Sequence, residues 1–335
     1  MAGDDTLTGG AGKDTLNGGE GSDTASYANA STMVKASLFN PSINFGQALG
    51  DTYSSIENLT GSNFNDSLFG DSGNNILEGG LGADLLNGGS GSDTASYRTA
   101  SAAVVASLAS PAANIGAAAG DTYVGIENLT GSSFDDTLTG NAVANILIGG
   151  AGADSLNGGL GLDTASYSGA TAGVIASLTS TVANSGDAAG DSYISIENLT
   201  GSNYSDKLTG NDQVNHIVGG DGHDSLVGLA GDDVLIGGAG QDTLTGGAGA
   251  DRFVFGPGDG ANTIADFQDG IDHLDVTAYG GYMSIAQLAA GAKVVFADGG
   301  YVILTGVTAA QLTAADFIGL PAPFAADPKA DWLFG

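Results

Sequence analysis

The stretch GGDGHDSLVGLAGDDVLIGGAGQDTLTGGAGADRFV, residues 219–254, decides the fold. It consists of four consecutive nine-residue copies of the pattern G-G-x-G-x-D-x-U-x, in which U is a large apolar residue. Glycines in the first six positions allow a tight turn with positive φ, and the last three positions suit a short strand with one side chain pointing inward. The stretch therefore predicts an all-β solenoid made of turns and very short strands.

Two periods run through the rest of the chain. Good copies of the nonapeptide begin at residues 9, 79, 149, 219 and 237, and near copies begin at 18, 88, 158, 228 and 246. A longer period of 70 residues places DTASY at 23–27, 93–97 and 163–167, and IENLTGS at 56–62, 126–132 and 196–202. About ten copies in phase cannot be accidental, so the solenoid extends over most of the chain.

The spacing of the aspartates predicts a metal site. Two nonapeptides complete one coil, so residues 18 apart stack: Asp66 on Asp84, Asp136 on Asp154, and Asp206, Asp224 and Asp242 in one column opposite Asn215, Asp233 and Asp251. Each stacked pair of turns offers two carboxylates and several carbonyls, an all-oxygen set that suits Ca²⁺, and we expect about ten ions. The predicted metal-site residues are Asp5, Asp14, Asp23, Asp66, Asp84, Asp93, Asp136, Asp154, Asp163, Asp206, Asp224, Asp233, Asp242 and Asp251, with the turn glycines Gly79, Gly82, Gly149, Gly152, Gly219, Gly222, Gly237 and Gly240.

Composition agrees with a cation as the main partner. The formal net charge is -31, only five of the 38 acidic residues are Glu, and seven Lys and Arg cannot pair with the remainder. Such a chain repels nucleic acid and anionic membrane surfaces, which excludes both as expected partners. It has no cysteine, no apolar run of about 18 residues that predicts a membrane span, and no signal peptide in MAGDDTLTGG.

We divide the chain as follows. Calcium-binding blocks cover 61–96, 131–166 and 201–254, after a truncated-looking start at 1–26, and coils with protruding loops but without calcium turns cover 27–60, 97–130 and 167–200. In those coils Glu57, Glu127 and Glu197 could add a metal ligand together with Asp51, Asp121 and Asp191. Residues 255–320 read as a β-rich cap with a short helix at 284–292, and 321–335 as a tail.

These residues resemble the RTX calcium-binding family of exported bacterial proteins, and FGPGDGANTIADFQDGIDHLDV (255–276) resembles the C-terminal cap of serralysin-type proteases. The resemblance implies a right-handed parallel β-roll, calcium between successive turns, and type I secretion through an uncleaved C-terminal signal. The ending DWLFG (331–335) is similar to such signals. The family resemblance also implies that the protein is secreted. The segment AGDDTLTGG (2–10) begins in the middle of the nonapeptide pattern, so we expect the chain to be a portion of a larger protein.

Three roles follow for a solenoid that folds on binding calcium after export. The first is a structural, surface or matrix protein that assembles with itself, end to end or laterally. The second is the secretion and folding module of a larger protease, lipase or polysaccharide epimerase. The third is an adhesin or a module that binds cell-surface polysaccharide. Because the chain has neither an HExxH nor a GxSxG motif, and His216 and His223 fill variable repeat positions, we expect no enzyme activity.

Overall fold

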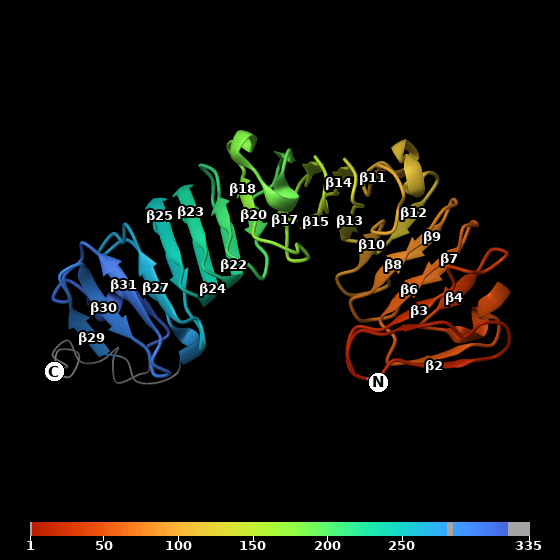
Figure 1. Ribbon diagram of the computed structural model, residues 1–335, viewed down its shortest axis with the longest axis horizontal. Helices are drawn as coiled ribbons and strands as arrows, with labels where there is room; N and C mark the ends of the chain where they lie inside the picture. The colour runs from red at the N-terminus through yellow and green to blue at the C-terminus, as the bar shows by residue number, and fades with distance from the viewer. Residues whose placement is uncertain (1, 280–283, 321–335) are drawn as a thin grey trace. The chain divides into compact units, whose positions relative to one another are not determined.

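The computed structural model describes residues 2–279 and 284–320, and in this part of the chain the regular elements are short β-strands and 3-10 helices. The chain forms two compact units. Unit 1 holds Met1–Ala165 with Asp191–Ile196, and unit 2 holds Ser166–Gly190 with the chain from Glu197 onward. Within each unit most strands lie side by side and pair in parallel, as β6, β8 and β10 do in unit 1 and β22 and β24 in unit 2 (Figure 1).

Unit 1 consists of strands of two or three residues that alternate between opposite walls. One wall contains, in spatial order, β1 (Thr6–Leu7), β3 (Thr24–Ser26), β6 (Asn58–Thr60), β8 (Ile76–Glu78), β10 (Thr94–Ser96), β13 (Asn128–Thr130), β15 (Ile146–Ile148) and β17 (Thr164–Ser166). The other strands form the sheets β2 (Thr15–Asn17) with β5 (Thr52–Ser54); β4 (Lys35–Ser37), β7 (Ser67–Phe69), β9 (Leu85–Asn87) and β12 (Thr122–Val124); and β11 (Val105–Ser107), β14 (Thr137–Thr139), β16 (Ser155–Asn157) and β19 (Ser192–Ile194).

Unit 2 follows the same plan with longer strands. Its first wall contains β20 (Asn198–Thr200), β22 (His216–Gly222), β24 (Val234–Gly240), β26 (Arg252–Val254), β28 (His273–Asp275) and β32 (Phe317–Ile318). Its second wall contains β18 (Ile175–Ser177), β21 (Lys207–Thr209), β23 (Ser225–Ala230), β25 (Thr243–Ala248), β27 (Ala261–Ile264), β31 (Tyr301–Thr305), β30 (Gly291–Val295) and β29 (Ser284–Gln287).

The register confirms two nonapeptides per coil. Leu208 pairs with Leu226, and Leu226 with Leu244, each 18 residues further along the chain. These side chains hold the inward position of the pattern and are fully buried, as are Leu68, Leu86 and the other central strand residues. Stacked apolar side chains between two parallel walls form the core, so the predicted all-β parallel β-roll is confirmed.

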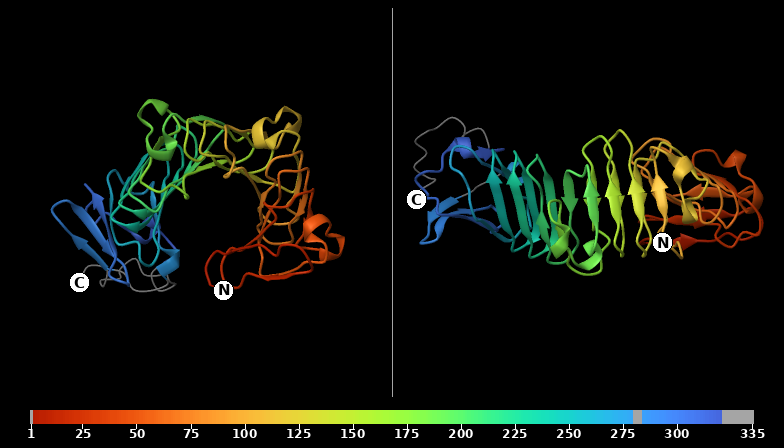
Figure 2. Two further views of the ribbon diagram at one scale, coloured as in Figure 1. Left: turned by 45° about the vertical axis from the view of Figure 1, so that its right-hand side comes forward. Right: turned by 90° about the horizontal axis from the view of Figure 1, so that it is seen from above.

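The segments without calcium turns also form coils. In unit 1, Thr94 pairs with Asn128 and Leu85 with Thr122, so the strands keep their pairing across registers of 34 and 37 residues. The additional residues leave the walls as loops with 3-10 helices, visible as coiled ribbons outside the strands (Figure 2). These helices are η1 (Pro41–Ile43), η2 (Gly46–Ala48), η3 (Pro111–Ala113) and η4 (Gly116–Ala118) in unit 1, and η5 (Thr181–Ala183) and η6 (Gly186–Ala188) in unit 2.

A β-rich cap follows the last nonapeptide. Its aromatic core includes Phe255 and Tyr279, whose rings lie 5.5 and 4.5 Å from that of Phe296. The short helices η7 (Thr277–Tyr279) and η8 (Ala314–Asp316) belong to this cap. The helix expected at 284–292 is wrong: Ser284–Gln287 is strand β29, paired antiparallel with β30, because Ile285 is buried opposite Val294. The predicted tail at 321–335 lies outside the described residues.

No helix in the described part of the chain is long and apolar enough to cross a membrane.

Candidate metal centre

The nonapeptide turns stack at very short distance. In the turn that contains Asp242, Gly238 and Gly240 have φ of 91° and 154°. A Cβ on Gly238 would lie 2.1 Å from the carbonyl oxygen of Gly220 in the preceding turn. Glycine is therefore required here both for its positive φ and for the close approach, and the carbonyl oxygens of one turn face the next turn.

One oxygen of most repeat aspartates holds two neighbouring turns together. Asp224 donates its backbone N–H to Oδ1 of Asp242 at 2.9 Å, and Asp233 donates to Oδ1 of Asp251 at 3.0 Å. Asp66 and Asp136 donate in the same way to Asp84 and Asp154. The stacking predicted from the 18-residue spacing is thus present in the structure.

The second oxygen of most of these aspartates is buried without a hydrogen-bond partner. Burying a carboxylate oxygen in this way costs several kcal/mol unless a positive charge compensates it. The orphaned atoms are the Oδ2 atoms of Asp5, Asp14, Asp23, Asp84, Asp93, Asp154, Asp163, Asp224, Asp233, Asp242 and Asp251. All eleven belong to the set predicted from the sequence, and this pattern fits a cation between the turns.

Burial also shifts the acidity of these groups. Desolvation raises the pKa of Asp84, Asp154 and Asp224 to about 7, and that of Asp242 and Asp251 to about 6. The negative charge of a neighbouring carboxylate adds to the effect, as Asp242 does for Asp224. A divalent cation would reverse both effects, because it favours the ionised form.

The remaining ligands would come from the backbone. Within residues 2–279 and 284–320, no three His, Cys, Asp or Glu side chains form a cluster that could hold a metal ion. A cation between two turns would therefore be held by one or two carboxylates and by carbonyl oxygens such as those of Gly220 and Gly222, which face Gly238 and Gly240. An all-oxygen set of this kind suits Ca²⁺.

Three predicted aspartates have a different environment. Asp66 accepts the hydroxyl of Ser62 at 2.8 Å on Oδ2, the same oxygen accepts the backbone N–H of Ser62, and Oδ1 accepts the N–H of Val34 at 2.6 Å. Asp136 has the corresponding bonds with Ser132 and Val104, and Asp206 with Ser202 and Val174. Both oxygens of each carboxylate thus have partners within the chain.

The proposed joint site of Glu57 and Asp51 is wrong. Asp51 accepts the N–H of Asp14 at 2.9 Å, whereas Glu57 accepts the N–H of Asp23 at 2.8 Å. Since Asp14 precedes β2 and Asp23 precedes β3, the two acids continue opposite columns. The second repeat has the same arrangement: Asp121 accepts the N–H of Asp84, and Glu127 accepts the N–H of Asp93.

Sequence reasoning missed the residues that end the columns. Asp242 donates its N–H to Oδ1 of Asn262 at 2.9 Å, and Asp251 donates to Oδ1 of Asp272 at 3.0 Å. Both oxygens of Asp266 accept N–H groups, from Gly246 and Gly247. The cap places these residues 19 to 21 positions after their donors, so a search for an 18-residue spacing does not find them.

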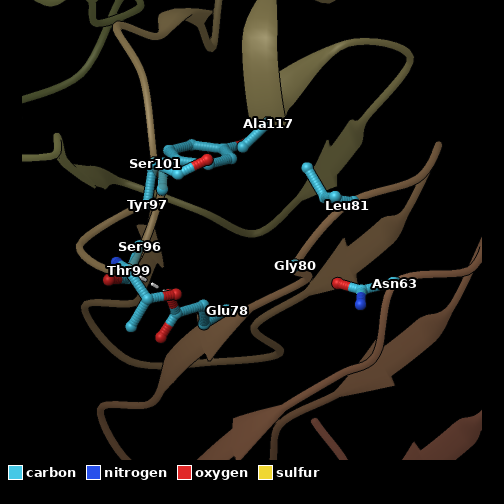
Figure 3. A pocket seen from close by; sticks show the side chains of 10 residues that line it. Asn63, Glu78, Gly80, Leu81, Ser96, Tyr97, Thr99, Ser101 and Ala117 are labelled. Atoms are coloured by element: carbon cyan, nitrogen blue, oxygen red, sulfur yellow. Dashed lines mark hydrogen bonds between the residues drawn. The ribbon is translucent and has the colours of Figure 1, made fainter. Parts of the chain in front are cut away.

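A separate pocket of about 180 Å³ lies in unit 1 and is lined by ten residues, including Asn63, Glu78, Ser96 and Tyr97 (Figure 3). Its carboxylate, Glu78, accepts both the N–H and the hydroxyl of Thr99. The hydroxyl of Tyr97 donates to Asp121. The carboxylate and the tyrosine hydroxyl of the pocket are thus hydrogen-bonded within the chain.

The stacked turns and their buried carboxylates define a calcium-binding β-roll. The model of the RTX calcium-binding nonapeptide repeat (4 copies) matches residues 1–25, 60–95, 129–165, 195–226 and 227–264, just over half of the chain. The chain therefore belongs to the RTX calcium-binding repeat family.

Similar solved structures include two subunits of the mannuronan C5-epimerase of Azotobacter vinelandii. The AlgE6R3 subunit is 33% identical over 38% of this chain and 82% of its own, with a TM-score of 0.30. The AlgE6R2 subunit is 33% identical over 37% and 94%, with a TM-score of 0.29. The extracellular lipase LipA of Serratia marcescens is 16% identical over 76% of this chain and 39% of its own, with a TM-score of 0.29. A search of curated protein sequences found no match.

Proposed function

We propose that this protein is a secreted β-roll whose folding is driven by calcium outside the cell. The observation that carries the proposal is the set of eleven buried carboxylate oxygens without partners. Without a cation, the folded state must bury these oxygens uncompensated while the chain carries a net charge of -31. Calcium at extracellular concentrations, on the order of 10⁻³ M, compensates the buried oxygens and reduces the net negative charge, whereas cytosolic levels do not.

We further propose that the chain has a structural role at the cell surface or in a matrix and is not itself an enzyme. This is supported by its composition of repeats and cap and by the internal bonding of the Glu78 pocket. Edge strands of a sheet can pair with another copy of the chain, which would be a route to self-association. Export by a type I system, polysaccharide binding and assembly remain parts of this proposal.

A calcium titration followed by circular dichroism and light scattering tests the proposal. We expect the metal-free chain to have clearly less β-structure than the calcium-loaded chain, and millimolar Ca²⁺ to restore the missing structure cooperatively, with Mg²⁺ at the same concentration far less effective. Growth in particle size after folding supports the structural role. A metal-free chain that is as folded and as heat-resistant as the calcium-loaded one would disprove the calcium-driven folding.

Asp242→Asn is the informative variant in this titration, because it removes a carboxylate whose Oδ2 is orphaned. Asp212→Asn is its matched control, since Asp212 is exposed and lies outside the set of orphaned carboxylates. We expect the first variant to need more calcium for folding and the second to behave like the parent chain.

A further inference from the structure

The orphaned carboxylates are unevenly distributed along the columns. Apart from Asp5, whose turn includes a residue outside the described part of the chain, they occur in turns where the second and fourth positions both have positive φ, such as Gly80 and Gly82 before Asp84. Between these turns lie others whose carboxylate or amide side chains already have hydrogen-bond partners within the chain. We call these closed turns. We infer that hydroxyl and amide groups of the chain replace calcium in residues 27–76 and 97–146. These segments therefore hold together without metal. This inference rests on the calcium-driven folding proposed above.

Serine replaces the cation in the first kind of closed turn. Ser62 and Ser132 stand where a calcium turn has its second glycine, and neither has positive φ. Their hydroxyls instead donate to both oxygens of Asp66 and Asp136, at 2.8 to 3.1 Å. Asp66 and Asp136 are only 2% exposed and have no free oxygen directed at a metal. These two turns are closed by hydrogen bonds alone.

An asparagine amide replaces the cation in the second kind of closed turn. Oδ1 of Asn145 accepts the N–H of Asn141 at 2.7 Å, and its Nδ2 donates to the carbonyl of Glu127 at 2.5 Å. Asn75 makes the equivalent bonds, to Asp71 and to the carbonyl of Glu57. A neutral amide thus supplies both the acceptor and the donor that hold the turn, and it brings no charge to compensate.

Tyrosine hydroxyls replace the cation in the loop-bearing coils. Asp121 is 1% exposed, and its Oδ2 accepts the hydroxyl of Tyr97 at 2.8 Å. Tyr97 is also hydrogen-bonded to Tyr123, whose hydroxyl accepts Nδ2 of Asn114 at 2.8 Å. The first repeat has the same network through Asp51, Tyr27, Tyr53 and Asn44. Here a buried carboxylate is satisfied entirely by neutral donors.

The closed turns divide the calcium turns into two classes. Asp84 lies between Asp66 and Asp121 on its column, and Asp93 lies between Asn75 and Glu127, so neither orphaned oxygen has a second orphaned oxygen next to it on the column. Orphaned carboxylates follow one another directly on a column at Asp5 and Asp23, Asp224 and Asp242, and Asp233 and Asp251. Among the described residues, these three pairs place two buried carboxylate oxygens without hydrogen-bond partners in neighbouring turns of one column. They form the tight sites, and the isolated turns bind more weakly.

Hydrogen–deuterium exchange on the full chain tests this inference. In calcium-free buffer we expect backbone N–H groups in 27–76 and 97–146 to stay at least tenfold better protected than those in 219–254, and calcium to protect 219–254 strongly. Equal exposure of all these segments without calcium, with protection restored uniformly, would overturn the inference while leaving the calcium-driven folding intact. A chain indifferent to calcium in every segment would instead overturn the proposed function.

Calcium counting on matched variants provides the second readout. Asp154→Asn and Asp136→Asn change two aspartates stacked 18 residues apart, the first orphaned and the second closed by Ser132. We expect Asp154→Asn to lose one weakly bound ion and Asp136→Asn to lose none. Ser132→Ala, which keeps the carboxylate, should lower the protection of 97–146 in calcium-free buffer. Loss of an ion in Asp136→Asn, or unchanged protection in Ser132→Ala, would overturn the inference.

Discussion

Asp242 accepts the backbone N–H of Asp224 at 2.9 Å through Oδ1 and leaves its Oδ2 buried and unpartnered. The hydrogen bond fixes the orientation of the carboxylate before any ion arrives, so little side-chain entropy remains to be lost on binding. The same relationship holds between Asp251 and Asp233 in the opposite column. Turn stacking and ion binding therefore depend on the same side chains.

Replacing Asp242 by Asn should weaken the tightest calcium sites. Asn keeps an acceptor for the N–H of Asp224 but removes the charge that faces the cation. We expect calcium affinity at that site to fall tenfold or more, which corresponds to about 1.4 kcal/mol or more. Isothermal titration calorimetry measures the change, with Asp212→Asn as the control. An unchanged isotherm would show that Asp242 is not a ligand.

The metal-free chain should become more stable as the pH falls. Burial raises the folded-state pKa of Asp84, Asp154 and Asp224 to about 7, above the value of about 3.9 in an unfolded chain. The folded state therefore binds protons more tightly, so the stability that these groups contribute is fully present near pH 4 and is lost as the pH rises through 7. Thermal unfolding of calcium-free protein should show a higher Tm at pH 5.5 than at pH 8.

Calcium should reverse this trend, because protons compete with the ion for the same carboxylates. With saturating calcium at pH 8, lowering the pH to 5.5 should reduce the Tm and release ions. Parallel pH trends with and without calcium would contradict a role of these aspartates in binding.

Gly238→Ala should destabilise the roll in calcium by about 1–3 kcal/mol or prevent its folding. The added Cβ would lie 2.1 Å from the carbonyl oxygen of Gly220, on a backbone with φ of 91°. Gly258→Ala is the matched control, because Gly258 has φ of 96° and nothing within 4 Å of the added Cβ. Chemical denaturation of the two variants separates the steric effect from the conformational one, and equal losses would argue against close stacking.

Leu235→Ala should cost about 2–5 kcal/mol of unfolding free energy. Leu235 is fully buried between Ile217 and Phe253, its partners in the adjacent strands. Leu160→Ala, at a position 72% exposed, should change the unfolding free energy by less than about 0.5 kcal/mol. Denaturant unfolding in saturating calcium gives both values. Similar values for the two variants would contradict a core of stacked leucines.

The structure of the repeated nonapeptides could be predicted from the sequence. The nonapeptide around Asp242 predicts a turn, a strand and an orphaned carboxylate, because each depends on residues within the pattern or 18 positions away. Asn262 and Asp272 were missed because the cap ends the columns at a different spacing. The strand at Ser284–Gln287 was missed because its pairing with β30, rather than local propensity, determines its conformation.

The hydrogen bonds of Asp66 could have been predicted from a single residue of the sequence, Ser62. Ser62 stands where a calcium turn has glycine, and a hydroxyl four residues before a buried carboxylate can bond to it. The network of Tyr97, Tyr123, Asn114 and Asp121 could not, because it joins residues up to 26 positions apart across a loop.

The loops with 3-10 helices leave the walls between β4 and β5 and between β11 and β12 without disturbing strand pairing. The loops differ at single positions although the frame beneath them is the same: Phe39, 76% exposed in the first loop, corresponds to Ala109 in the second. An insertion that returns the chain to its register is a place where evolution can exchange surface character from one repeat to the next at little cost to the scaffold. The molecule thus combines loops of varying sequence with a regular β-roll.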